Sequence, residues 1–126
     1  MSAAELGRVQ LLIMQVLWRR GPTTARDITD DLNRREDIAH STVQTLLRGL
    51  EDKGAVSHEV EGRTFRFFAL VKEGEFKQSA TSDFLQRVFG GSVESLVSHL
   101  LSNEKVSRQE LADLKKLINQ KSKEED

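Results

Sequence analysis

The chain has 126 residues, 31% of them charged, and a formal net charge of −1 at pH 7. This length suits one domain, or one small domain with a helical appendage. The chain has no cysteine, which excludes disulfides, thiol catalysis and thiolate metal sites. No apolar run approaches the ~20 residues that span a bilayer, and no secretory signal is recognisable. Membrane insertion is therefore not expected, and the cytoplasm is the expected location.

The charge is balanced along the chain as well as overall. Residues 1–71 hold 10 Lys+Arg and 10 Asp+Glu, and residues 72–126 hold 9 and 10. A chain without a basic domain can bind nucleic acid only through local placement of cations, supplemented by helix N-termini.

Two helices are expected in the first third of the chain. The first spans Glu5–Arg20, where apolar residues recur at helical spacing over more than one stripe. Gly21 and Pro22 end it. The second spans Thr23–Leu32, and Thr24 with Asp27 has the spacing of a capping box at its start.

A polar loop at 33–37 leads into a third helix, expected within residues 38–54. Ser41 and Gln44 have the spacing of a capping box, and Gly54 suits a left-handed C-terminal cap. One face of this helix is an apolar stripe of Val43, Leu46, Leu47 and Leu50. The opposite side carries hydroxyls, an amide and a guanidinium, which are Ser41, Thr42, Gln44, Thr45 and Arg48. Such groups can address base edges and phosphates.

A β-hairpin follows directly after the third helix. The stretches 56–60 and 64–70 are rich in β-branched and aromatic residues, and Glu61-Gly62-Arg63 provides the turn. Helix, turn, helix and hairpin in this order indicate a winged helix-turn-helix that binds DNA. We expect Gln44, Thr45 and Arg48 to read bases. The residues expected at the DNA backbone are Arg26, Ser41, Thr42, Arg63 and Arg66.

An alternative interpretation is that these residues form an ordinary solvent-exposed surface. Ser41 and Gln44 could have no role other than capping the helix. A second hypothesis is a winged-helix protein-protein interaction module without DNA readout, which the near-neutral charge favours. Strong salt dependence of DNA binding would count against it.

Residues 72–126 are expected to form three further helices. They hold too few residues to bury a core alone, so their apolar stripes need another surface. A second copy of the chain is the simplest candidate for this surface, because two-fold homodimers are the commonest oligomers. The expected dimerisation residues are Phe84, Val88, Leu111, Leu114, Leu117 and Ile118.

No enzymatic site is apparent. The three histidines are scattered without metal-ligand spacing, and the carboxylates Asp27, Asp30 and Asp31 have no nucleophile or base beside them. No glycine-rich phosphate loop is present, so neither a metal nor a cofactor is expected.

Several motifs along the chain resemble those of the BlaI/MecI penicillinase-repressor family. In the N-terminal half they are Ile13-Met14-x-x-Leu17-Trp18, Ser41-Thr42-Val43-x-Thr45-Leu46-Leu47-x-x-Leu50 and Lys53-Gly54. In the C-terminal half they are Phe84-Leu85-x-x-Val88-Phe89-Gly90-Gly91, Ser95-Leu96-Val97 and Glu110-Leu111-x-x-Leu114. The likeness covers nearly the whole chain in order.

This resemblance implies a mainly α protein with a small β-hairpin wing. An N-terminal winged helix-turn-helix domain (1–71) would bind a dyad-symmetric DNA operator, and a C-terminal three-helix domain (72–126) would form the homodimer. It further implies control of β-lactam resistance genes, with release when a sensor metalloprotease of the BlaR/MecR type leads to cleavage of the repressor.

Three features depart from the family pattern. The position matching the family's Asn-Phe cleavage site is His99-Leu100, and Leu100 lies on the expected inner stripe of its helix. Copper sensing through cysteines, found in CopY-like relatives, is excluded. In the helix expected to read DNA, Gln44 and Gly49 stand where the best-known repressors have arginines, and Arg48 stands where they have a threonine. The family's operator sequence is therefore not carried over to this chain.

Overall fold

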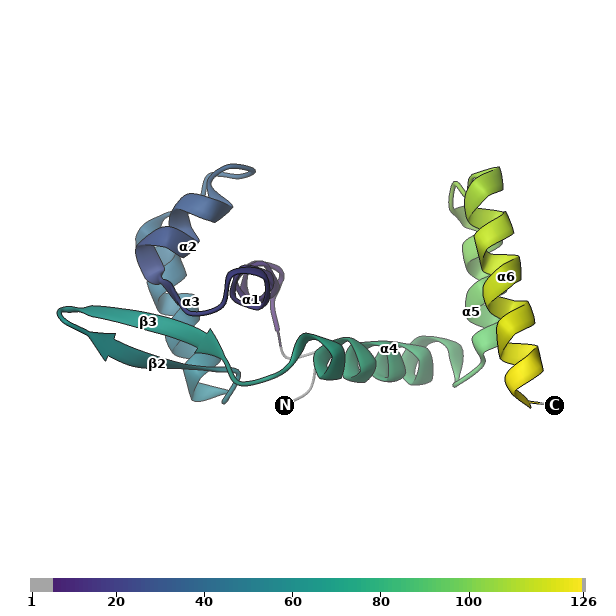
Figure 1. The fold of residues 1–126 in the computed structure, drawn as a ribbon. Coiled ribbons are helices and arrows are strands. Elements are labelled where there is room, and N and C mark those ends of the chain that lie inside the picture. Colours follow the sequence, from purple (N-terminus) through teal and green to yellow (C-terminus); the bar gives the residue numbers. More distant parts are fainter. Residues whose placement is uncertain (1–5, 126) are drawn as a thin grey trace. The chain divides into compact units, whose positions relative to one another are not determined.

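The computed structural model describes residues 6–125. Its helices are α1 (Arg8–Arg20), α2 (Ala25–Leu32), α3 (His40–Asp52), α4 (Glu73–Phe89), α5 (Val93–Asn103) and α6 (Arg108–Glu125). Its strands are β1 (Thr23–Thr24), β2 (Val56–Glu61) and β3 (Thr64–Ala69). The expected fold class is confirmed: helices dominate, and the antiparallel hairpin β2–β3, here called the wing, extends from α1–α3 (Figure 1).

The chain divides into two compact units, the first ending at Phe84 and the second beginning at Leu85. The division falls inside α4. The N-terminal part of α4 belongs to the first unit, where Phe76 is buried and its ring centroid lies 5.4 Å from that of Trp18. The indole nitrogen of Trp18 donates a hydrogen bond to the Val71 carbonyl at 2.8 Å, which fixes the segment between the wing and α4.

The first unit has one hydrophobic core, built from the inner faces of α1, α2 and α3 and the base of the wing. The expected stripe of α3 supplies Val43, Leu47 and Leu50, which are all buried, whereas Leu46 is only partly buried. The other core residues are Ile13, Met14, Val16, Leu17, Ile28, Leu32, Ile38, Ala55 and Val56. The helical periodicity of the sequence therefore predicts the buried faces.

The turn between α2 and α3 is held by a single amide side chain. Asn33 donates from Nδ2 to the carbonyls of Thr29 (2.7 Å) and Ile38 (2.8 Å). Its Oδ1 accepts from the Ile38 amide at 3.1 Å. His40 Nδ1 lies 3.0 Å from the Thr29 hydroxyl, which adds a second link between the helices. These bonds set the angle at which α3 leaves α2.

The start of α3 differs from the expectation. The helix begins at His40 with Ala39 as its N-cap, and no side chain caps it. The expected capping box of Ser41 and Gln44 is therefore wrong. The contacts of Asn33 and His40 fix the N-cap at Ala39, two residues before Ser41. The side chains of Ser41 and Gln44 remain exposed on the helix.

The sheet also has one strand more than expected. Thr23 and Thr24 were assigned to the second helix, but they form β1 and pair antiparallel with Phe67 and Arg66 of β3. The strand order is β1-β3-β2. The capping role of Thr24 is confirmed, since its hydroxyl accepts from the Asp27 amide at 3.1 Å. Two threonines are too short a run to show strand periodicity, so only the pairing with β3 defines them.

Candidate nucleic-acid interface

The outer side of α3 is a continuous exposed polar surface. The buried stripe faces α1 and α2, and helical spacing then turns the remaining positions to solvent. All five residues that the sequence places there are exposed: Ser41, Thr42, Gln44, Thr45 and Arg48. None of them is covered by the protein's own interior, so this face is free to contact a partner.

The wing is joined to the last turn of α3 by one side-chain pair. Glu51 of α3 hydrogen-bonds the imidazole of His58 in β2. The His58 ring stacks on Phe65 of β3, with centroids 4.3 Å apart and planes at 18°, and its centroid is 5.5 Å from that of Phe67. These contacts place the wing beside the polar side of α3.

Register determines which wing residues face α3. His58 pairs with Phe67, and Val60 pairs with Phe65. Because side chains alternate across a strand, these four lie on one face of the hairpin. Arg66, between the two phenylalanines, lies on the other face. There it donates to the Glu61 carboxylate, and to the Pro22 carbonyl at 3.3 Å.

Three arginines surround this surface without a carboxylate partner. Arg26 is exposed at the start of α2, Arg48 on α3 and Arg63 at the wing turn. No salt bridge joins any of the three to an acidic residue in the part of the chain described, 6–125. Their positive charge is therefore available to an anion.

Three arginines elsewhere in the first unit, Arg8, Arg19 and Arg20, are paired with acidic residues. Arg8 makes two hydrogen bonds to Glu36, at 2.7 and 2.8 Å, and this bonding holds the pKa of the Glu36 carboxyl below its ordinary value. Arg19 and Arg20 both reach Asp31, at 2.6 and 3.4 Å. Partial burial opposes ionisation of Asp31, but the hydrogen bond from Arg19 and the nearby guanidinium charges outweigh it and lower the pKa of that carboxyl. Unlike Arg8, Arg19 and Arg20, the three arginines around the α3 surface therefore have no direct carboxylate partner that offsets their charge.

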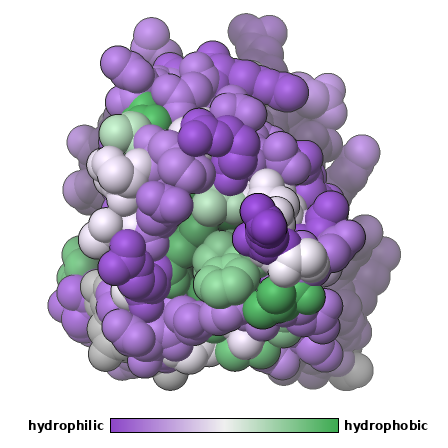
Figure 2. Space-filling model, turned by 90° about the vertical axis from the view of Figure 1, so that its left-hand side faces the viewer, coloured by the Kyte–Doolittle hydropathy of each residue, from purple (hydrophilic) through white to green (hydrophobic). Residues whose placement is uncertain are grey.

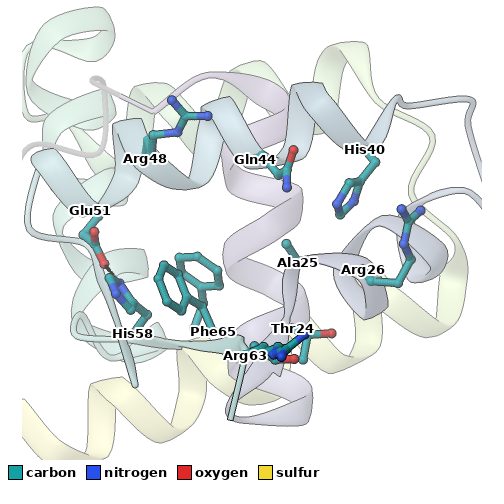
Figure 3. A pocket seen from close by; sticks show the side chains of 12 residues that line it. Thr24, Ala25, Arg26, His40, Gln44, Arg48, Glu51, His58, Arg63 and Phe65 are labelled. Atoms are coloured by element: carbon teal, nitrogen blue, oxygen red, sulfur yellow. Dashed lines mark hydrogen bonds and ion pairs between the residues drawn. The ribbon is translucent and has the colours of Figure 1, made fainter. Parts of the chain in front are cut away.

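A cleft of about 470 Å³ opens between α3, the start of α2 and the wing. We call it the wing cleft. Figure 2 shows this face of the molecule, with apolar side chains in a hollow and hydrophilic ones around it. In Figure 3, Gln44 and His40 point from α3 toward the cavity, the ring of Phe65 stands at its side, and the guanidinium of Arg48 points away.

The second unit presents a different kind of surface. No side chain of α5 or α6 is buried among their described residues. Leu117 and Ile118 are 61% and 60% exposed, and Leu114 is half-buried. Of the other expected dimerisation residues, Val88 and Leu111 are also exposed here, and Phe84, the last residue of the first unit, is exposed as well.

The expected cleavage position lies within α5. His99 and Leu100 are both exposed, and the His99 ring centroid is 5.8 Å from that of Phe89. The expectation that Leu100 is a core residue is wrong for the single chain, because α5 has too little chain around it to cover its apolar stripe.

Residues 6–125 contain no cluster of three His, Asp or Glu side chains that could hold a metal ion. Within the same range, no helix combines the length and apolar character needed to cross a bilayer.

Sequence reasoning missed three features of this surface. They are the partial burial of His40 against Thr29, the Glu51–His58 link and the exposed aromatic side of the wing. The exposed aromatic side of the wing did have a signal in the sequence. The apolar or aromatic residues His58, Val60, Phe65 and Phe67 alternate along the two strands. An apolar face of this kind is unusual for a hairpin that is exposed only to solvent.

A family model for the penicillinase repressor matches residues 6–120. The methicillin resistance regulatory protein MecI of Staphylococcus aureus strain N315 is 25% identical over 117 residues, covering 93% of this chain and 95% of MecI. The penicillinase repressor of Bacillus licheniformis is 26% identical over 114 residues, covering 90% of this chain and 89% of that protein.

The solved structures that are similar to this chain include the following two. One is the DNA-binding domain of the repressor BlaI, with a TM-score of 0.52 and 26% identity, covering 60% of this chain and 93% of that domain. The other is a MarR-like transcriptional regulator from Thermotoga maritima, with a TM-score of 0.51 and 20% identity, covering 95% of this chain and 77% of the regulator. The second likeness concerns the fold alone.

Proposed function

The chain belongs to the penicillinase repressor family and is a DNA-binding transcriptional repressor, and we propose that it acts as a homodimer on a dyad-symmetric operator in the cytoplasm. The observation that carries this proposal is the exposed polar side of α3 beside three arginines that have no carboxylate partner. Mobility shift with intact and half operators would test the dyad, because a half operator should bind far more weakly. Cell fractionation would test the location.

We infer that α3 enters the major groove. Thr45, Arg48 and Gln44 then read base edges, because amide and guanidinium groups match the hydrogen-bond patterns of adenine and guanine. The two α3 helices of a dimer would occupy successive major grooves ~34 Å apart. The Arg48 guanidinium points outward from the wing cleft, which supports a role in contacting a base.

The phosphate contacts are assigned to Ser41, Thr42, Arg26 and Arg63. Arg26 and the N-terminus of α2 offer positive charge to one strand of the duplex. Arg63 at the wing turn offers positive charge to the DNA backbone that flanks the groove occupied by α3. Arg66 is left out of this set, because Glu61 already neutralises its charge on the other face of the wing.

Alanine variants separate these roles. Arg48→Ala should cost ~1–3 kcal/mol on the operator and much less on random DNA, whereas Arg63→Ala should weaken both alike. Arg66→Ala is the matched control on the wing and should change neither by more than twofold. Mobility-shift titrations at fixed salt measure all three. Unchanged operator affinity in Arg48→Ala would remove that residue from the base-reading set.

We propose that repression ends by proteolysis at or near His99–Leu100, through a membrane sensor metalloprotease, and that the regulated genes confer β-lactam resistance. The exposure of both residues in α5 supports access by a protease. Mass spectrometry of the repressor from β-lactam-treated cells would test this. An intact chain in derepressed cells would contradict it.

A protein-protein interaction module remains the competing function, favoured by the net charge of −1. The two functions differ in salt dependence. Binding through several phosphates should weaken steeply between 50 and 200 mM salt, by about tenfold or more. Operator affinity that is indifferent to salt would favour the protein partner.

A further inference from the structure

The wing cleft has the dimensions of a small-molecule site. Its volume of about 470 Å³ falls within the range of ~300–1,000 Å³ that is common for ligand pockets. Three separate parts of the first unit form its walls: α3, the β1–α2 junction and the wing. Its shape is therefore a product of the tertiary fold rather than of one flexible loop.

One wall of the cleft is aromatic and not covered by the protein. Phe65 is 47% exposed although it stacks on His58, and its centroid lies 6.4 Å from that of Phe67 in an edge-on arrangement. Ala25 adds a small apolar surface opposite (Figure 3). A flat ring placed here would stack on Phe65 and remove its apolar surface from water.

The charged groups around the cleft favour an anion. Arg26 and Arg63 line it, and no carboxylate among residues 6–125 pairs with them; Arg48 lines it as well, but its guanidinium points away from the cavity (Figure 3). The one lining carboxylate, Glu51, is hydrogen-bonded to His58 on the side of the cleft away from Arg26 (Figure 3). The other lining titratable group, His40, is held by Thr29.

We propose that the wing cleft binds a small aromatic carboxylate whose ring stacks on Phe65 and whose carboxylate meets Arg63 or Arg26. Planar guanidinium groups bind carboxylates through two parallel hydrogen bonds, which fits this pairing of groups. The ligand is an antagonist of DNA binding, because it occupies the same arginines that the duplex phosphates need. The proposed antagonism rests on the proposed DNA-binding function, whereas the proposed ligand site in the wing cleft does not.

The size of the antagonism follows from mass action. Each chain of the proposed dimer has one wing cleft. A ligand that binds only the DNA-free repressor therefore weakens apparent operator affinity by the factor 1 + [L]/Kd for each cleft, and by the square of this factor for the dimer. At nine times its Kd, operator affinity should fall about hundredfold.

The first experiment measures ligand binding without DNA. The probe is 2-naphthoate, titrated into the full chain by isothermal titration calorimetry, with neutral 2-naphthylmethanol as the charge control. We expect saturable binding of one probe per chain and at least tenfold weaker binding of the alcohol. Absence of saturable binding, or equal binding of the alcohol, overturns the site.

Variants locate the site. Phe65→Ser should weaken 2-naphthoate binding about tenfold and Arg63→Gln several-fold. Arg66→Gln, on the opposite face of the same hairpin, should leave it unchanged. Phe65→Leu keeps apolar area and should fall between wild type and Phe65→Ser, which guards against misfolding of the serine variant. Equal binding by wild type and Phe65→Ser places the probe elsewhere and overturns the assignment.

The second experiment adds operator DNA. Operator affinity of the dimer should fall about hundredfold at a 2-naphthoate concentration of nine times Kd, and the alcohol at the same concentration should have no effect. If the probe binds the cleft and operator affinity does not change, the antagonist role is wrong while the site stands. If the chain binds the probe but no DNA at any salt concentration, the proposed function fails instead.

Discussion

Glu51 in the last turn of α3 and His58 in β2 form a side-chain hydrogen bond that joins this helix to the wing. The pair is reinforced by the stacking of His58 on Phe65, with ring centroids 4.3 Å apart. The two side chains are 34% and 29% exposed, so the bond is partly shielded from water. Because Arg63 stands at the turn of this hairpin, its position relative to α3 depends on this contact at the base of the wing.

Removal of this link should release the wing. We expect Glu51→Ala to weaken operator binding, and the double variant Glu51→Ala/Arg63→Ala to be no weaker than Arg63→Ala alone. The reason is that both changes remove the same wing contact, and coupled residues do not add. A mobility-shift double-mutant cycle measures this.

Glu59→Ala is the matched control, since it removes a carboxylate from the outer face of β2 without touching His58. It corrects for the general gain in DNA affinity that loss of any negative charge brings. Additive losses for Glu51→Ala and Arg63→Ala would show that the pair does not position the wing.

The apolar surface of α6 should hold the dimer together. Leu117→Glu with Ile118→Glu is expected to give a monomer by light scattering and a large loss of operator affinity, because avidity between half-sites disappears. Both side chains are at least 60% exposed in the single chain, so the substitutions do not disturb the fold of one protomer.

Asn119→Glu with Gln120→Glu adds the same charge to the neighbouring polar positions of α6 and serves as the control. It should remain dimeric. A dimeric Leu117/Ile118 variant would exclude this face of α6 from the interface.

The Asp31 cluster predicts a pH dependence of stability. The pKa of Asp31 is lowered in the folded chain, so its contribution to stability is present above the ordinary value of 3.8 and is lost as pH falls through the lower folded value. Asp31→Asn should therefore melt below wild type at pH 7, by a few degrees. The difference should shrink as the pH falls below about 3.8.

Circular dichroism melts across this pH range measure the difference, with Asp30→Asn as the control. Asp30 is exposed on the same helix and has no salt bridge in the described part of the chain. A difference for Asp31→Asn that is constant with pH would show that ionisation of the carboxyl is not its cause.

Much of this arrangement follows from local patterns. The spacing of Val43, Leu47 and Leu50 predicts which side of α3 is buried, and so which side is left for a partner. The hairpin with Arg63 at its turn follows from alternating β-branched and aromatic residues around Glu61-Gly62-Arg63. Ser92 and Ser107 also cap α5 and α6 in the way local sequence patterns favour, each accepting a hydrogen bond from the amide three residues later.

The errors share one physical origin. The start of α3 depends on Asn33, which reaches back to Thr29 and forward to Ile38. The strand β1 exists because Thr23 and Thr24 pair with β3, more than forty residues away. Arg66 meets Glu61 because the hairpin register places them on the same face. Local propensity carries no information about any of these partners.

The sequence by itself determined the order of the helices, the buried face of α3, the wing and the family, because these follow from the period and order of side chains along the chain. Only the tertiary structure decided which arginines keep their charge available and that the wing cleft exists beside α3. Charge pairing and cavity shape depend on distances between residues remote in sequence, and folding alone sets those distances.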